Sequence, residues 1–133
     1  MKTLTKIACA GALSLSASMA NAQQSLRDVT YVTEGLIAVG IALEISDTCD
    51  SISGRTLRGI GYLNQLRNHA RGLGFSSAEI KAFTDSKSEK NRLEAIARQR
   101  LANMGARPGN AASYCAVGRA EIAKASPIGT LLR

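Results

Sequence analysis

The stretch Glu34–Asp50 reads EGLIAVGIALEISDTCD, an almost uninterrupted apolar run that ends beside a cysteine. Apolar residues recur at helical spacing along it and before it, over a length that exceeds a typical β-strand. This pattern predicts a buried helix around which the rest of the chain packs. Glu34 and Glu44 place charges within the run, which argues against a membrane-spanning helix. Small residues on one side, Gly35 among them, favour close approach of a neighbouring helix.

Four more helices are predicted downstream from apolar periodicity and from residues that begin or end helices. Ser76 and Ser86 each open a Ser-x-x-Glu capping box, and Asn110 is placed to cap the last helix. The predicted ranges are Arg55–Leu73, a short helix after Ser76, a longer helix from Ser86 to Gly105, and Ala111–Ala125. With no convincing strand, the chain is predicted to be all-α, a compact bundle of about five helices.

The second predicted helix carries an apolar stripe at helical spacing, which predicts that this face packs inward. Its N-terminal cap is expected at Asp50, Ser51 or Ser53. The short tail Ile128–Leu132 is apolar and must either pack against the domain or mediate a contact. The residues of the stripe are Leu57, Ile60, Leu63, Leu66, Ala70 and Leu73.

A secretory signal peptide is predicted over Met1–Ala22, because a basic start precedes the short apolar segment Ile7–Leu15 and small residues at Ala20 and Ala22. Cleavage is expected between Ala22 and Gln23, with a weaker alternative after Ala20. The apolar segment is too short to serve as a membrane anchor, since a spanning helix needs roughly 20 apolar residues. We therefore expect a periplasmic protein whose residues 23–133 form a single domain without a transmembrane span.

The cysteines agree with an oxidising compartment. Cys9 leaves with the signal peptide, so only Cys49 and Cys115 remain and only one pairing is possible. A disulfide between them links the first and last helices, and by loop entropy it stabilises the fold by roughly 4 kcal/mol. The spacing does not match a zinc site or a Cys-x-x-Cys redox pair.

The net charge of +7 could indicate nucleic acid, a membrane surface or an acidic partner. The basic residues are spread along the chain with acidic residues among them, and the chain has two Phe, three Tyr and no Trp for stacking on bases. This distribution favours an ordinary solvated surface. No nucleic-acid partner is expected.

Residues for catalysis are sparse. His69 is the only histidine, and its setting beside Arg71 favours a surface or half-packed role. Glu44, Asp47 and Asp50 lie near one turn and could act as an acid and base pair on a glycosidic bond, although capping and solvation explain them more simply. No pattern for a metal, nucleotide or haem occurs, so no cofactor is predicted.

One side of the second helix resembles a contact surface. Arg58, Tyr62 and Gln65 follow at i, i+4 and i+7 with Arg55 nearby, and Arg and Tyr are enriched at protein interfaces. The alternative is an ordinary polar helix face, which remains open.

Several motifs together resemble a known family. They are GLIAVGIALEI at 35–45, TCDSISGRTLR at 48–58, GLGFSSAEIKAF at 72–83 and SYCAVGRAEIAKASPIGTLLR at 113–133. They resemble a family of small exported alphaproteobacterial proteins that share a domain of unknown function. The resemblance covers nearly the whole domain and implies export and a single domain, but no activity, substrate or catalytic residue.

The leading hypothesis is a non-enzymatic periplasmic binding module that contacts a protein or envelope partner through an exposed helix face or the C-terminal tail. One alternative is a small hydrolase of envelope polymers that uses the carboxylates near Cys49. Another is a periplasmic stress chaperone.

Overall fold

The computed structural model describes residues 24–133. The predicted signal peptide and its cleavage site lie outside these residues. Within them the chain is all-α with five α-helices, as the periodicity predicts, and two short 3₁₀-helices flank them. The α-helices are α1 (Thr30–Thr48), α2 (Thr56–Gly72), α3 (Ser77–Asp85), α4 (Lys87–Met104) and α5 (Ala111–Lys124), and the 3₁₀-helices are η1 (Leu26–Asp28) and η2 (Gly129–Leu131).

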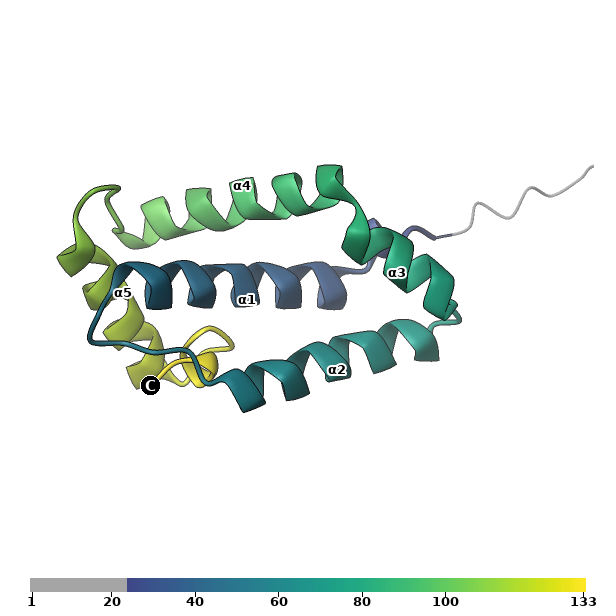
Figure 1. Cartoon of the computed structure of the whole chain (residues 1–133), viewed down its shortest axis with the longest axis horizontal. Coiled ribbons are helices and arrows are strands. Elements are labelled where there is room, and N and C mark those ends of the chain that lie inside the picture. The colour runs from purple at the N-terminus through teal and green to yellow at the C-terminus, as the bar shows by residue number, and fades with distance from the viewer. Residues whose placement is uncertain (1–23) are drawn as a thin grey trace, which may run out of the picture.

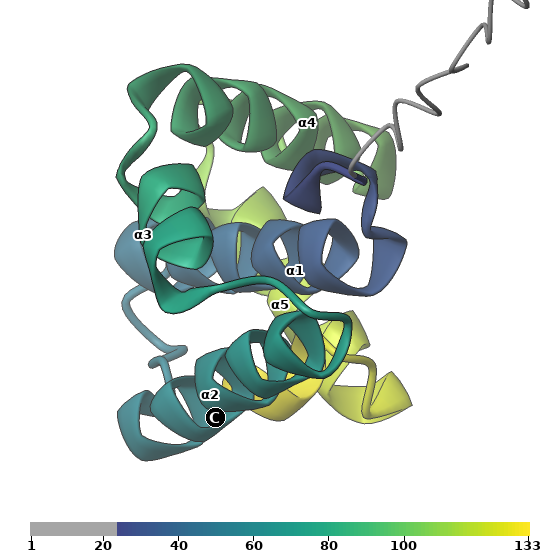
Figure 2. The ribbon, with the colours of Figure 1, turned by 90° about the vertical axis from the view of Figure 1, so that its right-hand side faces the viewer.

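The apolar helix α1 occupies the middle of the molecule, with α4 on one side and α2 on the other (Figures 1 and 2). The short α3 joins α2 to α4 at one end, and α5 crosses the opposite end, where α1 leads into α2 (Figure 1). Contacts of α1 with α2, α4 and α5 account for its broad apolar surface. Ile41 and Ile45 of α1 are almost completely buried, together with Leu101 of α4 and Leu132 at the C-terminus.

A small residue sets the approach of α2 to α1. The side chain of Leu66 covers Gly35, and its Cδ2 lies 2.5 Å from the position that a β-carbon at residue 35 would take. Leu66 is itself 3 % exposed. The expectation that Gly35 admits a close neighbour is therefore confirmed.

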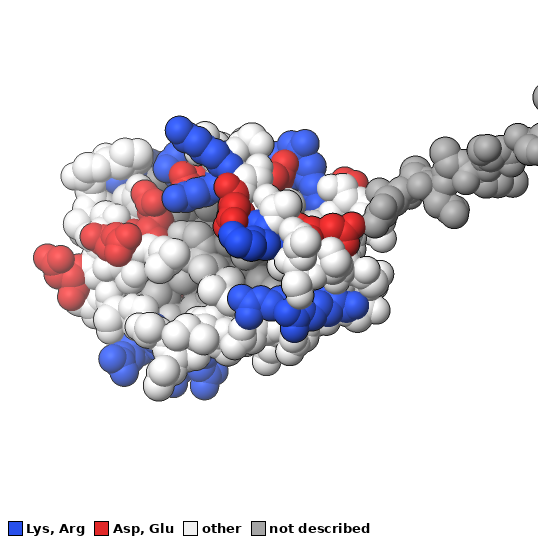
Figure 3. Space-filling model, turned by 45° about the vertical axis from the view of Figure 1, so that its right-hand side comes forward, with Lys and Arg blue, Asp and Glu red and all other residues white. Residues whose placement is uncertain are grey.

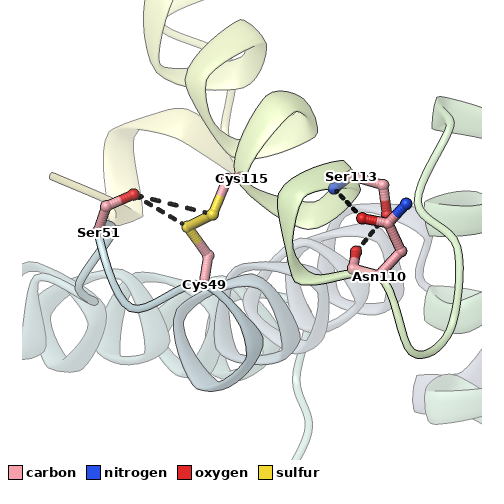
Figure 4. Close-up of a disulfide and its surroundings, with 5 residues drawn as sticks. All are labelled: Cys49, Ser51, Asn110, Ser113 and Cys115. Atoms are coloured by element: carbon pink, nitrogen blue, oxygen red, sulfur yellow. Dashed lines mark hydrogen bonds between the residues drawn. A yellow bond between two sulfur atoms is a disulfide. The ribbon is translucent and has the colours of Figure 1, made fainter.

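The predicted disulfide is present. Cys49, just after α1, is bonded to Cys115 of α5, with Cα atoms 5.2 Å apart and a sequence separation of 66. The hydroxyl oxygen of Ser51 lies 3.3 Å from the Cys49 sulfur and 3.8 Å from the Cys115 sulfur (Figure 4). Cys49 is fully buried and Cys115 is half-buried, so the bond closes the core where α1 meets α5.

The C-terminal tail is part of the core and does not form a free contact segment. Leu131 and Leu132 are 5 % and 2 % exposed. The backbone of Arg133 exchanges two hydrogen bonds with that of Ser53, at 2.9 and 3.0 Å, and the Arg55 N–H donates to the Leu131 carbonyl at 2.8 Å. The tail thus ties the end of the chain to the segment that leads into α2.

This pairing explains why the expected N-terminal cap of α2 is wrong. Asp50, Ser51 and Ser53 precede the helix, but Arg55 occupies the cap position and makes no side-chain capping bond. The backbone of residues 53 and 55 pairs with the tail, so the chain continues extended past Ser53 before the helix begins.

The caps predicted at Ser76 and Asn110 are confirmed, and the capping box predicted at Ser86 is formed in part. At Ser76 both halves of the capping box are formed, and the Asn110 side chain accepts from the Ser113 N–H at 3.2 Å (Figure 4). At Ser86 only the first half forms: its hydroxyl accepts from the Glu89 N–H. The Glu89 carboxylate instead forms ion pairs with Arg92 and Arg27.

Candidate functional site

The outer side of α2 is much less covered than its apolar stripe predicts. Of the six stripe residues only Leu66 and Ala70 are buried, and the prediction that the others pack inward is wrong. Because α2 packs against α1, α3 and η2 and no helix within residues 24–133 covers its outer side, the rest of the stripe faces solvent. The exposed fractions are 86 % for Leu57, 53 % for Ile60, 37 % for Leu63 and 51 % for Leu73.

The exposed aliphatic residues border a hollow between α1 and α2. It has a volume of about 230 Å³, and its walls include Ile60 and Leu63 of α2 and Val39 and Leu43 of α1. Leu43 is 56 % exposed. A second hollow of about 220 Å³ lies on the far side of Val39 and Leu43, against Phe83 and Leu93 of α3 and α4. The exposed edge of α1 therefore separates two shallow apolar grooves.

The charged side chains of α2 and of the segments that flank it in sequence are all basic. No Asp or Glu occurs from Ser51 to Ala78, whereas Arg55, Arg58, Arg67 and Arg71 do. Among residues 24–133 none of these four arginines forms an ion pair, although Arg92, Arg98 and Arg100 of α4 all do. Figure 3 shows the consequence: along the lower edge of the visible face, where α2 lies, every charged side chain is basic.

A small basic hollow lies between α2 and α3. We call it the basic hollow. It has a volume of about 180 Å³ and is lined by Arg67, Arg71, Ser77, Ile80, Lys81 and Thr84. Arg67 donates to the Asn64 side chain at 3.0 Å and Arg71 donates to the Ser77 hydroxyl at 3.1 Å. Both arginines are thus held by neutral partners and keep further N–H groups for an anion.

The predicted partner face is divided between surface and interior. Arg58 and Gln65 are exposed, as expected, but Tyr62 is half-buried against the core. Burial, together with the charge of Tyr31, raises the pKa of Tyr62 above its usual value. Tyr62 belongs to a hollow of about 370 Å³ whose walls also include Tyr31, Glu34 and Arg100.

The charged groups of this larger hollow satisfy one another. Arg100 donates to both carboxylate oxygens of Glu34, at 2.5 and 2.7 Å, and this hydrogen bonding lowers the pKa of Glu34 and raises that of Arg100. Burial raises the pKa of Glu121, but its hydrogen bonds with Lys124 and Ser126 and the charge of Lys124 outweigh it, so the net shift is downward.

The isolated histidine contacts an aromatic ring. The side-chain ring of His69 lies 4.4 Å from that of Tyr31, centroid to centroid and tilted by 41°. This contact joins the last turn of α2 to the first turn of α1. It gives His69 a packing role at the surface, in line with the interpretation of the sequence.

The three carboxylates of the hydrolase alternative lie at the end of α1 and just beyond it. Asp47 and Asp50 are exposed and Glu44 is half-exposed. None of them lines the hollows described above. Within residues 24–133 no cluster of three His, Cys, Asp or Glu side chains is placed to hold a metal ion.

Two features of this surface were missed in the sequence. The pattern of apolar residues places the whole stripe of α2 in the core, because periodicity does not show how many neighbours a helix has. The second feature can be read from the sequence: the segment from Ser51 to Ala78 contains four arginines and no acidic residue.

None of the helices described here is long and apolar enough to cross a membrane.

The fold and the site define a small all-α domain that is closed by a disulfide and exposes a basic and apolar helix. A family model described as a family of unknown function (DUF5333) matches residues 24–133. The chain belongs to this family, so the expected membership in a domain family of unknown function is confirmed. Neither a curated protein nor a solved structure matches the chain.

Proposed function

We propose that this protein is an exported, non-enzymatic binding module whose contact surface is one flank of α2. The flank consists of Leu57, Ile60, Leu63, Arg67 and Arg71, and we call it the α2 flank. The observation that carries the proposal is the exposure of its aliphatic side chains, with Leu57 at 86 % and Ile60 at 53 %. Exposed apolar groups gathered beside polar ones are typical of interaction sites.

The proposal of binding without catalysis is supported by where the titratable groups lie. Glu34 and Arg100 are paired with each other, and Glu121 contacts Lys124. Asp47 and Asp50 are exposed and stand outside the hollows. A general acid and base need a shared cleft in which a substrate can sit between them.

The proposal of export to the periplasm is supported by the disulfide and by the predicted signal peptide. Disulfides persist in oxidising compartments and are rare in the cytosol. The predicted signal peptide ends at Ala22, just before the family match begins at residue 24. The N-terminal sequence of protein purified from the periplasm tests this directly, and it should begin at Gln23.

The binding proposal is tested by capture from envelope extracts. A photo-reactive amino acid at residue 57 should form a crosslinked product that the same probe at exposed Arg119 does not form. With the probe moved to residue 60, the crosslinked product should form in the parent protein and be abolished by Leu57→Ser. Leu73→Ser is the control, because Leu73 is also an exposed leucine, at 51 %, but it lies at the C-terminal cap of α2 and outside the flank. Equal crosslinking at residues 57 and 119 would sink the proposal.

A further inference from the structure

We infer that the α2 flank binds the surface of an anionic phospholipid membrane. The phosphate of a lipid headgroup would sit in the basic hollow, and the aliphatic side chains of the flank would enter the interface beside it. This inference rests on the proposed function and names the partner of the same surface.

The residues of the flank lie on one side of α2. Leu63, Arg67 and Arg71 follow at i, i+4 and i+8, so they form one row on the helix surface. Ile60 precedes Arg67 by seven residues and joins the same side, and Leu57 lies at the N-terminal end. The row is therefore aliphatic in the first half of the helix and basic in the second.

The flank is positively charged. No acidic side chain occurs on α2 to neutralise its arginines. Guanidinium groups bind phosphate through paired N–H donors. The third cation of the basic hollow, Lys81, contacts Asp85 at an exposed position of α3, and such an exposed pair is weak enough to exchange for another anion.

An apolar groove adjoins the basic hollow. A hollow of about 200 Å³ lies between α1, α2 and α3, with Leu36, Leu63, Leu66 and Phe83 among its walls. It shares Arg67, Ile80 and Thr84 with the basic hollow. A site whose apolar groove opens beside three cations matches the chemistry of an anionic amphiphile.

The charge also decides against a second copy of the chain as the occupant. Packing α2 against α2 would bring two sets of four arginines together without an acidic residue between them, and like charges at an interface are strongly unfavourable. A basic amphipathic helix that lies in the membrane surface places its aliphatic side in the interface and its arginines at the headgroups.

The test uses the disulfide-bonded protein beginning at Gln23 and sedimented vesicles. One set contains phosphatidylglycerol in phosphatidylcholine, and the other contains phosphatidylcholine alone. Binding should be strong only with phosphatidylglycerol and should weaken as salt is raised. R67Q/R71Q should lower the partition coefficient about 25-fold, since each basic residue near an anionic surface contributes about a factor of five.

A matched control separates the site from net charge. R98Q/R119Q removes the same charge from exposed positions on α4 and α5 and should lower binding much less than R67Q/R71Q. Leu57→Ser should lower it, whereas Leu73→Ser should not. Circular dichroism of each variant establishes that it is folded, and all six substituted positions are exposed.

The outcomes separate this inference from the proposed function. Equal binding to both vesicle types, or equal losses for the two arginine pairs, overturns the membrane inference. Absence of vesicle binding overturns it too. If Leu57→Ser then still abolishes a crosslink to an envelope protein, the binding module stands with a protein partner. If vesicles are not bound and Leu57→Ser also leaves the crosslink unchanged, both proposals fall.

Discussion

Gly129 of η2 lies directly against the main chain of Glu121 in the last full turn of α5. A β-carbon at residue 129 would overlap the Glu121 carbonyl group and crowd the Ile122 nitrogen. The Ser126 N–H donates to the same Glu121 carbonyl at 3.3 Å, and the Gly129 N–H donates to the Ser126 hydroxyl at 3.0 Å. This contact turns the chain back so that Leu131 and Leu132 reach the core.

We expect Gly129→Ala to lower the free energy of unfolding by about 2–3 kcal/mol, because backbone cannot move aside as a flexible side chain can. Gly61→Ala is the control: nothing lies within 4 Å of a β-carbon there, so the change should stabilise α2 by up to about 1 kcal/mol through helix propensity. Urea unfolding monitored by circular dichroism measures both. Similar effects for the two changes would contradict the contact.

Loss of the disulfide should destabilise the fold without changing its helical content. The double variant C49A/C115A is expected to lose about 2–4 kcal/mol of unfolding free energy, given the 66-residue separation of the two cysteines. Reductant should lower the stability of the parent protein by a comparable amount and leave the double variant unchanged. A parent protein that is equally stable with and without reductant would count against the bond.

Burial within α2 should divide its leucines into two groups. Leu66→Ala should cost about 2–5 kcal/mol, since Leu66 is 3 % exposed and covers Gly35. Leu57→Ala should change stability by less than about 0.5 kcal/mol, since that side chain is 86 % exposed. Denaturant midpoints for the two variants give the comparison. A large loss for Leu57→Ala would show that the stripe is covered after all.

Acid should weaken the protein through its paired glutamates. The hydrogen bonds from Arg100 lower the pKa of Glu34 below its usual 4.5. A carboxyl whose folded pKa is lowered adds stability above its unfolded pKa and loses it as pH falls through the folded value. The unfolding free energy should therefore decline below about pH 4.5, and the exposure of the pair keeps the effect of Glu34 below about 1 kcal/mol.

Two single substitutions test the source of this pH dependence. Glu34→Gln and Arg100→Gln should each reduce the loss of stability between neutral and acid pH, because each removes the same ion pair. Thermal unfolding across a pH series provides the measurement. If both variants followed the parent curve in parallel, the pair would not contribute.

The sequence predicted well wherever a short local signal decides the structure. Ser76 caps α3 with both halves of its box because four consecutive residues supply every partner. The disulfide was predictable because only two cysteines lie within the domain. At Ser86 the same four-residue pattern forms only half of the capping box. The Glu89 carboxylate instead forms ion pairs with Arg92 and with Arg27, and Arg27 is distant in sequence.

The exposed surface depended on contacts that periodicity does not record. Leu57 and Leu66 belong to the same predicted stripe, yet one is 86 % exposed and the other 3 %. The difference arises because Gly35 has no side chain and lets Leu66 pack against α1, while no helix of the described chain reaches Leu57. Arg67, Arg71 and Lys81 likewise come together only because α3 folds back beside α2.

By itself the sequence determined the helical class, most helix ends and the single possible cysteine pair, because these follow from neighbouring residues and from composition. Only the tertiary structure decided which apolar residues are buried, how the tail pairs with Ser53, and where the unpaired arginines gather. Burial and charge clustering depend on which elements meet in space. The run from Glu34 to Asp50 is the centre of the core, and the surface that it leaves uncovered on α2 is where we place the function.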